Sequence, residues 1–300
     1  MKLKGLTDVE LSFRSRSGRT GHSTVTPYIV VDNFPYLGLL TSLRFLEWVS
    51  ENPEGLISLP TGKTPEYFIK WTMKFLHGWD KPETRRIMEE NGFSIRKKPV
   101  LRKLRFVQMD EFYPINPRQK NSFYDYVLNF YINGFGLDPS GAKLMNADRI
   151  TLFDGLHYSE VFPDNRIDLS LRNREAMTPL EKIQQASIFR IDNWCTEYEN
   201  QIRESGGIGF FLGGIGPDGS IAFNTRGSDH NSTTRLTATN FESQASSAGD
   251  LGGIEVSRKR LVLTIGLGTL TYNPDCSAIV FAAGEAKAQV IRNALENAPD

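Results

Sequence analysis

Short apolar runs alternate with amphipathic stretches along most of the chain, and this alternation limits the possible folds more than any other feature. Residues 55–59 are typical of a short buried strand, which leads directly into the turn 60–65 and a helix starting near Glu66. Before them, Leu39 and Leu43 recur with the spacing of a helix. Strand–turn–helix order is typical of parallel sheets. We therefore expect an α/β protein with a Rossmann-like, open and mostly parallel sheet and helices on both faces.

Further strands are predicted from apolar runs at residues 28–31, 104–109, 208–212, 261–265 and 278–282. Thr178 and Glu181 flank a proline in the pattern of a capping box, which predicts a long helix toward Arg203. A last helix is expected over residues 285–297. The polar stretches 82–103 and 148–177 fit the alternation poorly, so we expect them to be surface loops.

The domain organisation predicted from composition is simple. Residues 1–24 are rich in serine, arginine and glycine and are expected to form a loosely packed polar arm. The chain shows no internal repeat and no linker rich in proline and serine. We therefore expect residues 25–300 to form one α/β domain.

The charge balance and the cysteines exclude several classes of protein. Lysine and arginine together number 35, as do aspartate and glutamate, so the net charge of zero argues against a nucleic-acid or membrane-surface binder. Cys195 and Cys276 lie far apart and lack metal-site spacing, so neither a disulfide framework nor a metal site is expected. No apolar run approaches the ~18 residues of a membrane span. A cytoplasmic enzyme or binding domain is the simplest expectation.

The first candidate site is the turn formed by Thr61, Gly62, Lys63 and Thr64. In open parallel sheets, ligands bind at the carboxyl ends of the strands. A small turn before a helix offers backbone N–H groups and the positive end of the helix dipole to an anion. The spacing is not that of a Walker loop. An ordinary β-turn with a threonine N-cap would explain the same residues.

Two more strand ends carry candidate residues. Asp110 and Glu111 are adjacent, so their side chains point to opposite sides of a strand, and one could face a cleft while the other is structural. An exposed acidic pair is the simpler alternative. The loop after residues 208–212 has three glycines in four positions, which indicates close approach of a ligand, with Asp218 at its apex. Its candidate ligand-contacting residues are Gly214, Gly216, Gly219 and Ser220.

Taken together, these three segments resemble the glucosamine-6-phosphate deaminase/isomerase family. The family's hallmark motifs are an L-P-T-G-x-T-P turn, an M-D-E strand end and a G-G-[IV]-G-x-D-G-H-I-A-F-N loop. The resemblance extends over residues 28–297, with further segments in the same order at 121–124, 198–202, 232–235, 264–270 and 284–288. The related 6-phosphogluconolactonases share the architecture, but their loop continues as T-x-S-L-F-P. This chain has Ile-Ala-Phe-Asn at 221–224, which favours the deaminase branch.

The resemblance implies a substrate, a reaction and roles for individual residues. An amino sugar 6-phosphate would be bound at residues 61–64, and Lys287 would supply a cation for its phosphate. Asp110 would move the C2 proton, and loss of ammonia would leave fructose 6-phosphate. No metal or organic cofactor is implied, and relatives occur as monomers and rings, so a homo-oligomer is possible. A partly desolvated carboxylate at a strand end suits the role of a base.

The chain departs from the family where the sugar ring would be opened. The family has a histidine after Asp-Gly and a glutamate five residues later, but here these positions hold Ser220 and Thr225. Serine cannot shuttle a proton near neutral pH, and acid–base catalysis of this kind is worth about 10²–10⁴-fold. His230 could replace the missing imidazole as a catalytic residue, although a lone loop histidine is more often simply exposed. The alternatives are a phosphosugar-binding or regulatory domain and a lactonase, which would also need the histidine.

Two further departures concern arginine and the end of the chain. The family places a phosphate-binding arginine where this chain has Ser246, Ser247 or Gly249; Arg226 or Arg258 could compensate. Arg235 aligns with an effector-site arginine, but Thr237 replaces the neighbouring basic residue, so regulation by an effector is not expected. Relatives continue past the last helix into another strand. We expect either a chain truncated from a longer polypeptide, which the linker-like residues 297–300 favour, or a sheet without its last strand.

Overall fold

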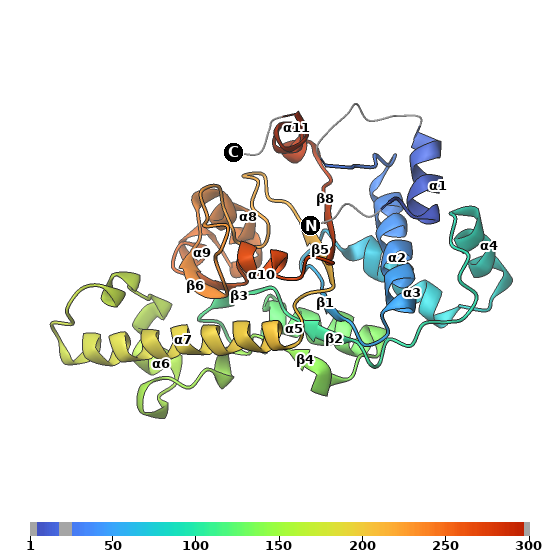
Figure 1. The fold of residues 1–300 in the computed structure, drawn as a ribbon. Helices are drawn as coiled ribbons and strands as arrows, with labels where there is room; N and C mark the ends of the chain where they lie inside the picture. The colour runs from blue at the N-terminus through green and yellow to red at the C-terminus, as the bar shows by residue number, and fades with distance from the viewer. Residues whose placement is uncertain (1–4, 18–25, 297–300) are drawn as a thin grey trace.

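The computed structural model of the protein describes residues 5–17 and 26–296. A five-stranded sheet with the order β4-β2-β1-β5-β8 lies at its centre (Figure 1). All neighbouring strands in this sheet are parallel, which confirms the predicted sheet. Its strands are β1 (Leu56–Ser58), β2 (Arg105–Val107), β4 (Ala142–Lys143), β5 (Phe210–Gly214) and β8 (Ser277–Phe281).

Helices cover both faces of the sheet, as predicted, because successive strand residues point to opposite sides. Ile57 and Phe210 belong to a core cluster with α2 and α3, whereas their neighbours Leu56 and Phe211 belong to a second cluster with α7. Figure 1 shows α2 and α3 together on one side of the strands and α7 on another. These helices are α2 (Phe34–Glu51), α3 (Glu66–His77) and α7 (Pro179–Glu204).

The helix predicted from the leucine spacing is α2. Asn33 caps it, since its side chain accepts a hydrogen bond from the Tyr36 N–H, and Leu39 and Leu43 are buried as expected. The strand predicted at residues 28–31 is wrong. This segment is an extended coil in which Ile29 and Val31 are half-buried against the core. The β-branched residues of this segment therefore pack against the core without pairing in a sheet. Strand propensity largely measures such side-chain packing, so it does not distinguish the two cases.

The expectation of a loosely packed arm is wrong for residues 8–17. They form α1 (Asp8–Ser17), in which Val9 and Phe13 are buried in the core. These two residues lie four apart and therefore on one face of the helix. The Arg44 side chain adds an ion pair of 2.8 Å with Glu10. Residues 1–4 and 18–24 of the predicted arm lie outside the described residues.

A second, three-stranded antiparallel sheet with the order β3-β7-β6 was not anticipated. Its strands are β3 (Asp110–Tyr113), β6 (Arg235–Ala238) and β7 (Leu261–Thr264). The run at 104–109 is therefore not one strand ending at Asp110, because β2 stops at Val107 and β3 begins at Asp110 in the other sheet. The run at 261–265 also pairs here rather than in the parallel sheet. Apolar runs predict strands but not their partners.

The long helix α7 starts as predicted and carries a buried acidic residue farther along. Thr178 and Glu181 form the capping box. The Glu181 N–H donates to the Thr178 hydroxyl (3.1 Å), and the Thr178 N–H donates to the Glu181 carboxylate (3.2 Å). Glu199 accepts hydrogen bonds from the hydroxyls of Thr234 (2.9 Å) and Thr269 (2.6 Å). Thr234 precedes β6 and Thr269 lies in α10 (Leu267–Thr271), so Glu199 joins three elements.

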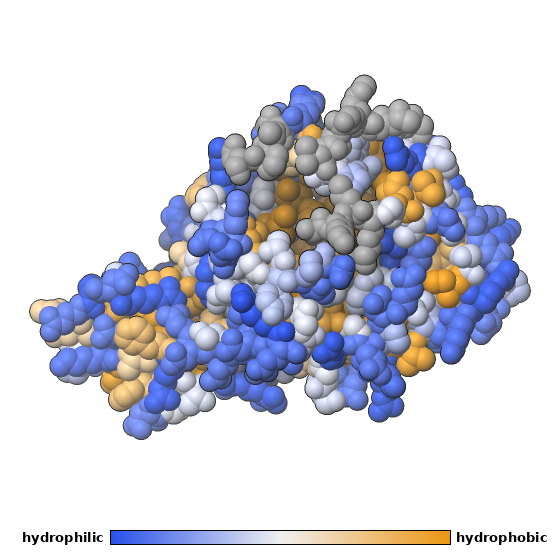
Figure 2. Space-filling view, viewed as in Figure 1, coloured by the Kyte–Doolittle hydropathy of each residue, from blue (hydrophilic) through white to orange (hydrophobic). Residues whose placement is uncertain are grey.

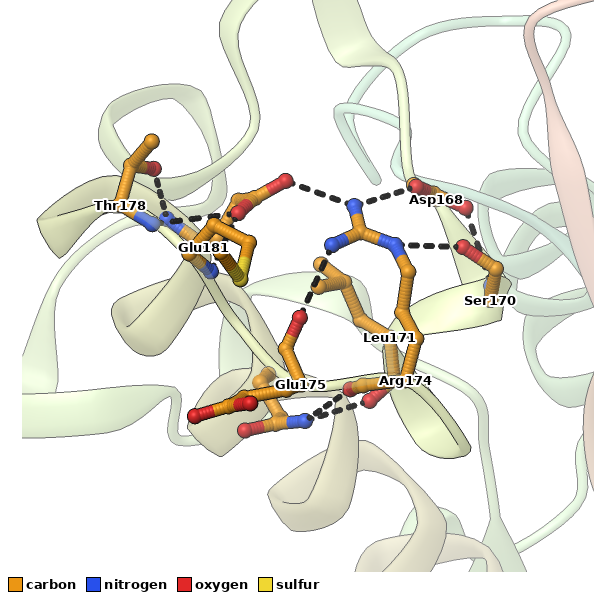
Figure 3. A network of polar contacts seen from close by, with 9 residues as sticks. Asp168, Ser170, Leu171, Arg174, Glu175, Thr178 and Glu181 are labelled. Atoms are coloured by element: carbon orange, nitrogen blue, oxygen red, sulfur yellow. Dashed lines mark hydrogen bonds and ion pairs between the residues drawn. The ribbon is translucent and has the colours of Figure 1, made fainter.

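The stretch 148–177 is an irregular excursion that projects with α7 from the rest of the molecule (Figure 1). It is more than a polar loop, since Val161 and Leu171 are fully buried in the second core cluster. Arg174 forms an ion pair with Asp168 of the same stretch (2.9 Å) and another with Glu181 in the first turn of α7 (2.6 Å), as Figure 3 shows. The second ion pair fastens the stretch to α7. Apolar surface lies among polar side chains on this projecting part (Figure 2).

The expected loop at 82–103 begins with a helix, α4 (Pro82–Glu90). Thr84 and Met88 lie four residues apart and are both buried, which gives the helix an inner face. Among the helices of the described ranges, none has both the length and the hydrophobicity needed to cross a membrane. The other main elements are α5 (Phe123–Val127), the π-helix η1 (Leu128–Asn133), α6 (Tyr158–Val161), α8 (Phe241–Leu251), α9 (Ile254–Ser257), the 3-10 helix η7 (Glu285–Lys287) and α11 (Ala288–Glu296).

Glu199→Ala should destabilise the fold, because it leaves the buried hydroxyls of Thr234 and Thr269 without their acceptor. We expect a loss of roughly 1–3 kcal/mol in the free energy of unfolding, measured in urea. Glu197→Ala, at an exposed position two residues earlier on the same helix, is the control and should change stability by less than about 0.5 kcal/mol. Equal effects of the two changes would contradict a structural role for Glu199.

Candidate active site

A pocket of about 210 Å³ lies where β1, β5 and β8 end at their carboxyl sides. Thr61 follows β1, Gly214 ends β5 and Lys287 follows β8, and all three line the pocket. Asp110, three residues beyond the end of β2, lines it as well. The carboxyl edge of a parallel sheet is the usual place for ligands in α/β folds. The segments singled out in the sequence therefore meet in one pocket.

The turn before α3 contributes Thr61 and Thr64 to the pocket wall. Gly62 has a φ of +85°, a conformation that favours glycine, and the exposed Lys63 does not line the pocket. Within the described ranges, no acceptor is seen for the backbone N–H groups of residues 61–64. The first turn of α3 also has no side-chain cap. The turn therefore keeps hydrogen-bond donors and the positive end of a helix dipole available for an anion.

Lys287 is the basic residue of the pocket. It lies in η7, next to the Gly284 turn with its φ of +93°, and it is half-buried. It forms no ion pair with any carboxylate of residues 5–17 or 26–296. Burial lowers the pKa of its ammonium group. A half-buried cation without an acidic partner is available to bind an anion that enters the pocket.

Asp110 and Glu111 are both buried, and their surroundings differ as expected for neighbouring residues of one strand. The Glu111 carboxylate accepts hydrogen bonds from the Ser122 hydroxyl (2.6 Å) and from the N–H groups of Tyr124 (2.7 Å) and Phe112 (2.9 Å). It therefore links β3 to the start of α5. Asp110 points into the pocket instead, and its Oδ1 has no hydrogen-bond partner within the described part of the chain.

Burial, and then the charge of Glu111, raise the pKa of Asp110 to about 8. Burial also raises the pKa of Glu111, to about 7, and its hydrogen bonds from Ser122 and three N–H groups keep this rise smaller than that of Asp110 because they favour the ionised form. Glu111 therefore loses its proton before Asp110, and Asp110 gains and loses a proton near neutral pH. A carboxyl group with such a pKa, open to a pocket, can act as a general base or acid.

The glycine-rich loop after β5 folds back tightly around Asp218. The Gly216 N–H donates to the Ser220 carbonyl (2.8 Å), and the Gly219 N–H donates to the Gly216 carbonyl (3.0 Å). A Cβ atom on Gly216 would lie 2.3 Å from Asp218 Oδ1, so a larger residue there would displace the Asp218 carboxylate. Ala222, also in the pocket wall, has a φ of +52°, which is strained for a residue with a side chain.

Asp218 is held ionised at the rim of the pocket. The Ser220 hydroxyl donates to its Oδ1 (2.7 Å) and the Asn240 amide donates to its Oδ2 (2.6 Å). Burial alone would raise the pKa of Asp218, but these hydrogen bonds outweigh it and lower the pKa below its ordinary value. Ser220 thus donates a hydrogen bond to the aspartate two residues before it.

Several residues considered from the sequence lie elsewhere. His230 is exposed and does not line the pocket, and neither do Thr225 and Gly219. Arg226 is exposed, and Arg258 pairs with Glu255 at 3.0 Å, so neither arginine reaches the pocket. The structure therefore brings the phosphate turn, Asp110, Asp218, Ser220 and Lys287 together without His230.

Sequence reasoning missed the first residues of α8. Ser243 lines the pocket, as does Ser246, whose neighbourhood the family comparison had indicated. Asn240 caps this helix by accepting a hydrogen bond from the Ser243 N–H (2.9 Å). The polar residue before residues 241–251 was the available signal, because asparagine is a favoured N-cap.

The known proteins that this chain resembles are named glucosamine-6-phosphate deaminases and 6-phosphogluconolactonases. No family model matches the chain. Glucosamine-6-phosphate deaminase of Borrelia hermsii is 44% identical over 112 residues, which are 36% of this chain and 40% of that protein. Human glucosamine-6-phosphate deaminase 2 is 26% identical over 240 residues, 80% of this chain and 66% of that protein. This chain is a homologue of the glucosamine-6-phosphate deaminases.

Solved structures of a deaminase and a lactonase have a fold similar to that of this chain. A monomeric glucosamine-6-phosphate deaminase superposes with a TM-score of 0.61 and 20% identity, covering 90% of this chain and 87% of that one. A 6-phosphogluconolactonase from Trypanosoma cruzi gives a TM-score of 0.55 at 15% identity, with coverages of 93% and 89%. This chain thus shares its fold with both the deaminase and the lactonase. Its match to the Borrelia hermsii deaminase spans two fifths of that protein's length.

The unpaired carboxyl of Asp110 should make stability depend on pH. Its folded pKa of about 8 lies above the ordinary value of 3.8, so between these values the folded state binds a proton that the unfolded state has lost. Stability is therefore expected to fall as the pH rises through this window. In Asp110→Asn this contribution disappears, and at pH 8 the variant should be the more stable protein by on the order of a few kcal/mol.

Urea unfolding between pH 5 and pH 8.5 measures this effect. Asp80→Asn is the control because Asp80 is exposed, and its unfolding free energy should follow the unaltered protein across the range. If Asp110→Asn kept the same pH dependence as the unaltered protein, the raised pKa of Asp110 would be refuted.

Proposed function

We propose that this protein is an enzyme of the glucosamine-6-phosphate deaminase/isomerase type, which converts an amino sugar 6-phosphate into fructose 6-phosphate and ammonia. The observation that carries the proposal is the shared pocket of Asp110 and Lys287. A group that can accept a proton and a cation that can hold an anion face the same 210 Å³ space. The names of its homologues support the substrate class.

In the proposed reaction the chain's own residues bind the substrate and move one proton. The phosphate binds to the free N–H groups and hydroxyls of Thr61 and Thr64, and Lys287 compensates its charge. This leaves the sugar carbons beside Asp110, which in its ionised form takes the proton from C2 and returns it at C1. The resulting imine at C2 then adds water and loses its nitrogen as ammonia, which gives the C2 ketone of fructose 6-phosphate. The ionised Asp218 faces the polar part of the sugar. Desolvation in the pocket matches the pKa of Asp110 to this task.

Incubation with glucosamine 6-phosphate, with assays of ammonia and fructose 6-phosphate, tests the proposal. We expect turnover whose kcat/KM rises about tenfold per pH unit below pH 8 and levels off above, because only ionised Asp110 is a base. Asp110→Asn should lose about 10²–10⁴-fold in kcat while still binding the substrate. A pH profile that is flat between pH 6 and pH 9 would show that Asp110 is not the base.

A phosphosugar-binding or regulatory domain is the second candidate function. It is favoured by Ser220 and Thr225, which stand where the family has histidine and glutamate, and by the exposed position of His230. In this case the phosphate site, including Lys287, would be retained and turnover would be lost. Lactonase-type hydrolysis gains nothing from these substitutions, since it also needs the histidine.

Calorimetry with glucosamine 6-phosphate, run beside the ammonia assay, separates the two functions. Binding without ammonia release would favour the binding domain. Ser220→His should raise a measurable rate of ammonia release at least about tenfold, or produce release where the unaltered protein has none, because it restores a group that titrates near neutral pH. His230→Ala is the matched control and should leave the rate unchanged, since His230 lies outside the pocket. A loss of rate in His230→Ala would instead assign the proton transfer to His230.

A further inference from the structure

Asn240 makes two hydrogen bonds that connect different parts of the site. Its Nδ2 donates to Asp218 Oδ2 (2.6 Å), and its Oδ1 accepts from the Ser243 N–H (2.9 Å). The first bond reaches the glycine-rich loop, and the second caps α8. Ser243 lines the pocket. One side chain therefore connects the Asp218 carboxylate to the helix that forms the neighbouring part of the pocket wall.

Capping alone does not account for the choice of asparagine. Serine, threonine and aspartate also accept a hydrogen bond at the N-cap of a helix. Only asparagine among them carries two N–H donors beside the accepting oxygen. Aspartate would place a second carboxylate against Asp218, and serine is too short to reach it while capping. The second bond, to Asp218, is what the amide adds.

The Asp218 carboxylate accepts hydrogen bonds at both of its oxygens. Ser220 donates to Oδ1 with its hydroxyl (2.7 Å) and its N–H (3.3 Å), and Asn240 donates to Oδ2, so two different segments of the chain hold the carboxylate. The Ser220 hydroxyl comes from the same tight turn as Asp218 and can fix only the position of the carboxylate within the loop. Asn240 is the donor that sets its orientation relative to α8 and to the pocket.

We propose that Asn240 is a positioning residue, which orients the Asp218 carboxylate toward the substrate and couples it to α8. The proposal rests on the function proposed above, because Asp218 must face the bound sugar. Asn240 itself does not line the pocket, so it acts through Asp218. The other ionisable groups around the pocket are Asp110 from β3 and Lys287 from η7.

Two variants that both keep the helix cap test the proposal. Asn240→Ser retains an N-cap acceptor but loses the donor to Asp218, and Asn240→Asp retains the cap and adds a negative charge. We expect Asn240→Ser to lose about 10–100-fold in kcat, the range for a hydrogen bond to a charged group, with a much smaller change in KM. Melting temperatures and helical circular dichroism of both variants should stay close to those of the unaltered protein.

A carbon-13 NMR titration of Asp218 provides a measurement that does not depend on activity. Loss of the Asn240 donor should raise the pKa of Asp218 in Asn240→Ser by about one unit, and the added charge should raise it further in Asn240→Asp. An unchanged Asp218 titration in both variants would overturn the proposal and leave Asn240 as a helix cap only. If Asn240→Ser fails to fold, the Asn240→Asp titration decides alone.

The failure of the proposed function would look different. If the unaltered protein released no ammonia from glucosamine 6-phosphate, the enzymatic proposal would fall, while the Asp218 titration would still show whether Asn240 orients the carboxylate. Calorimetry with glucosamine 6-phosphate would then replace kcat, and weaker binding to Asn240→Ser than to the unaltered protein is expected. Equal affinities together with an unchanged titration would exclude the positioning role.

Discussion

The buried carboxylate of Glu111 is the interaction on which the candidate site depends. It has no solvent exposure and is satisfied by Ser122 and by three backbone N–H groups, which attach β3 to the first turn of α5. Because neighbouring strand residues point to opposite sides, this anchoring directs Asp110 into the pocket. The charge of Glu111, close behind, adds to the effect of burial on the proton affinity of Asp110. A structural carboxylate thus helps to determine the chemistry of the one beside it.

Unsatisfied and strained groups are found at the pocket. Asp110 lacks a partner at Oδ1, Lys287 has no acidic partner in the described ranges, and Ala222 adopts a positive φ. Glu199, by contrast, is buried with every bond satisfied by α7, α10 and the start of β6. Such a contrast is typical of ligand sites, where the fold keeps groups available for a substrate at a cost in stability.

The pocket differs from the family pattern in a coherent way. With serine at position 220, Asp218 is bonded to Ser220 and Asn240, and these hydrogen bonds keep it ionised. Under the proposed function, Lys287 would supply the cation for the phosphate, and Ser243 and Ser246 of α8 would offer hydroxyls to it. The site would then keep a proton-accepting carboxyl and an anion-binding turn, and the change would lie in the group available for opening a sugar ring.

The sequence by itself determined the local elements and the chemistry of the candidate residues. Helical spacing of leucines, the capping box at Thr178 and the apolar runs predicted α2, α7 and most strands, because these signals act within a few residues. Only the tertiary structure decided that residues 261–264 join an antiparallel sheet, that Phe13 anchors α1, and that His230 stays outside the pocket. Strand pairing, burial and the direction of a loop depend on contacts between distant segments, which local patterns do not encode.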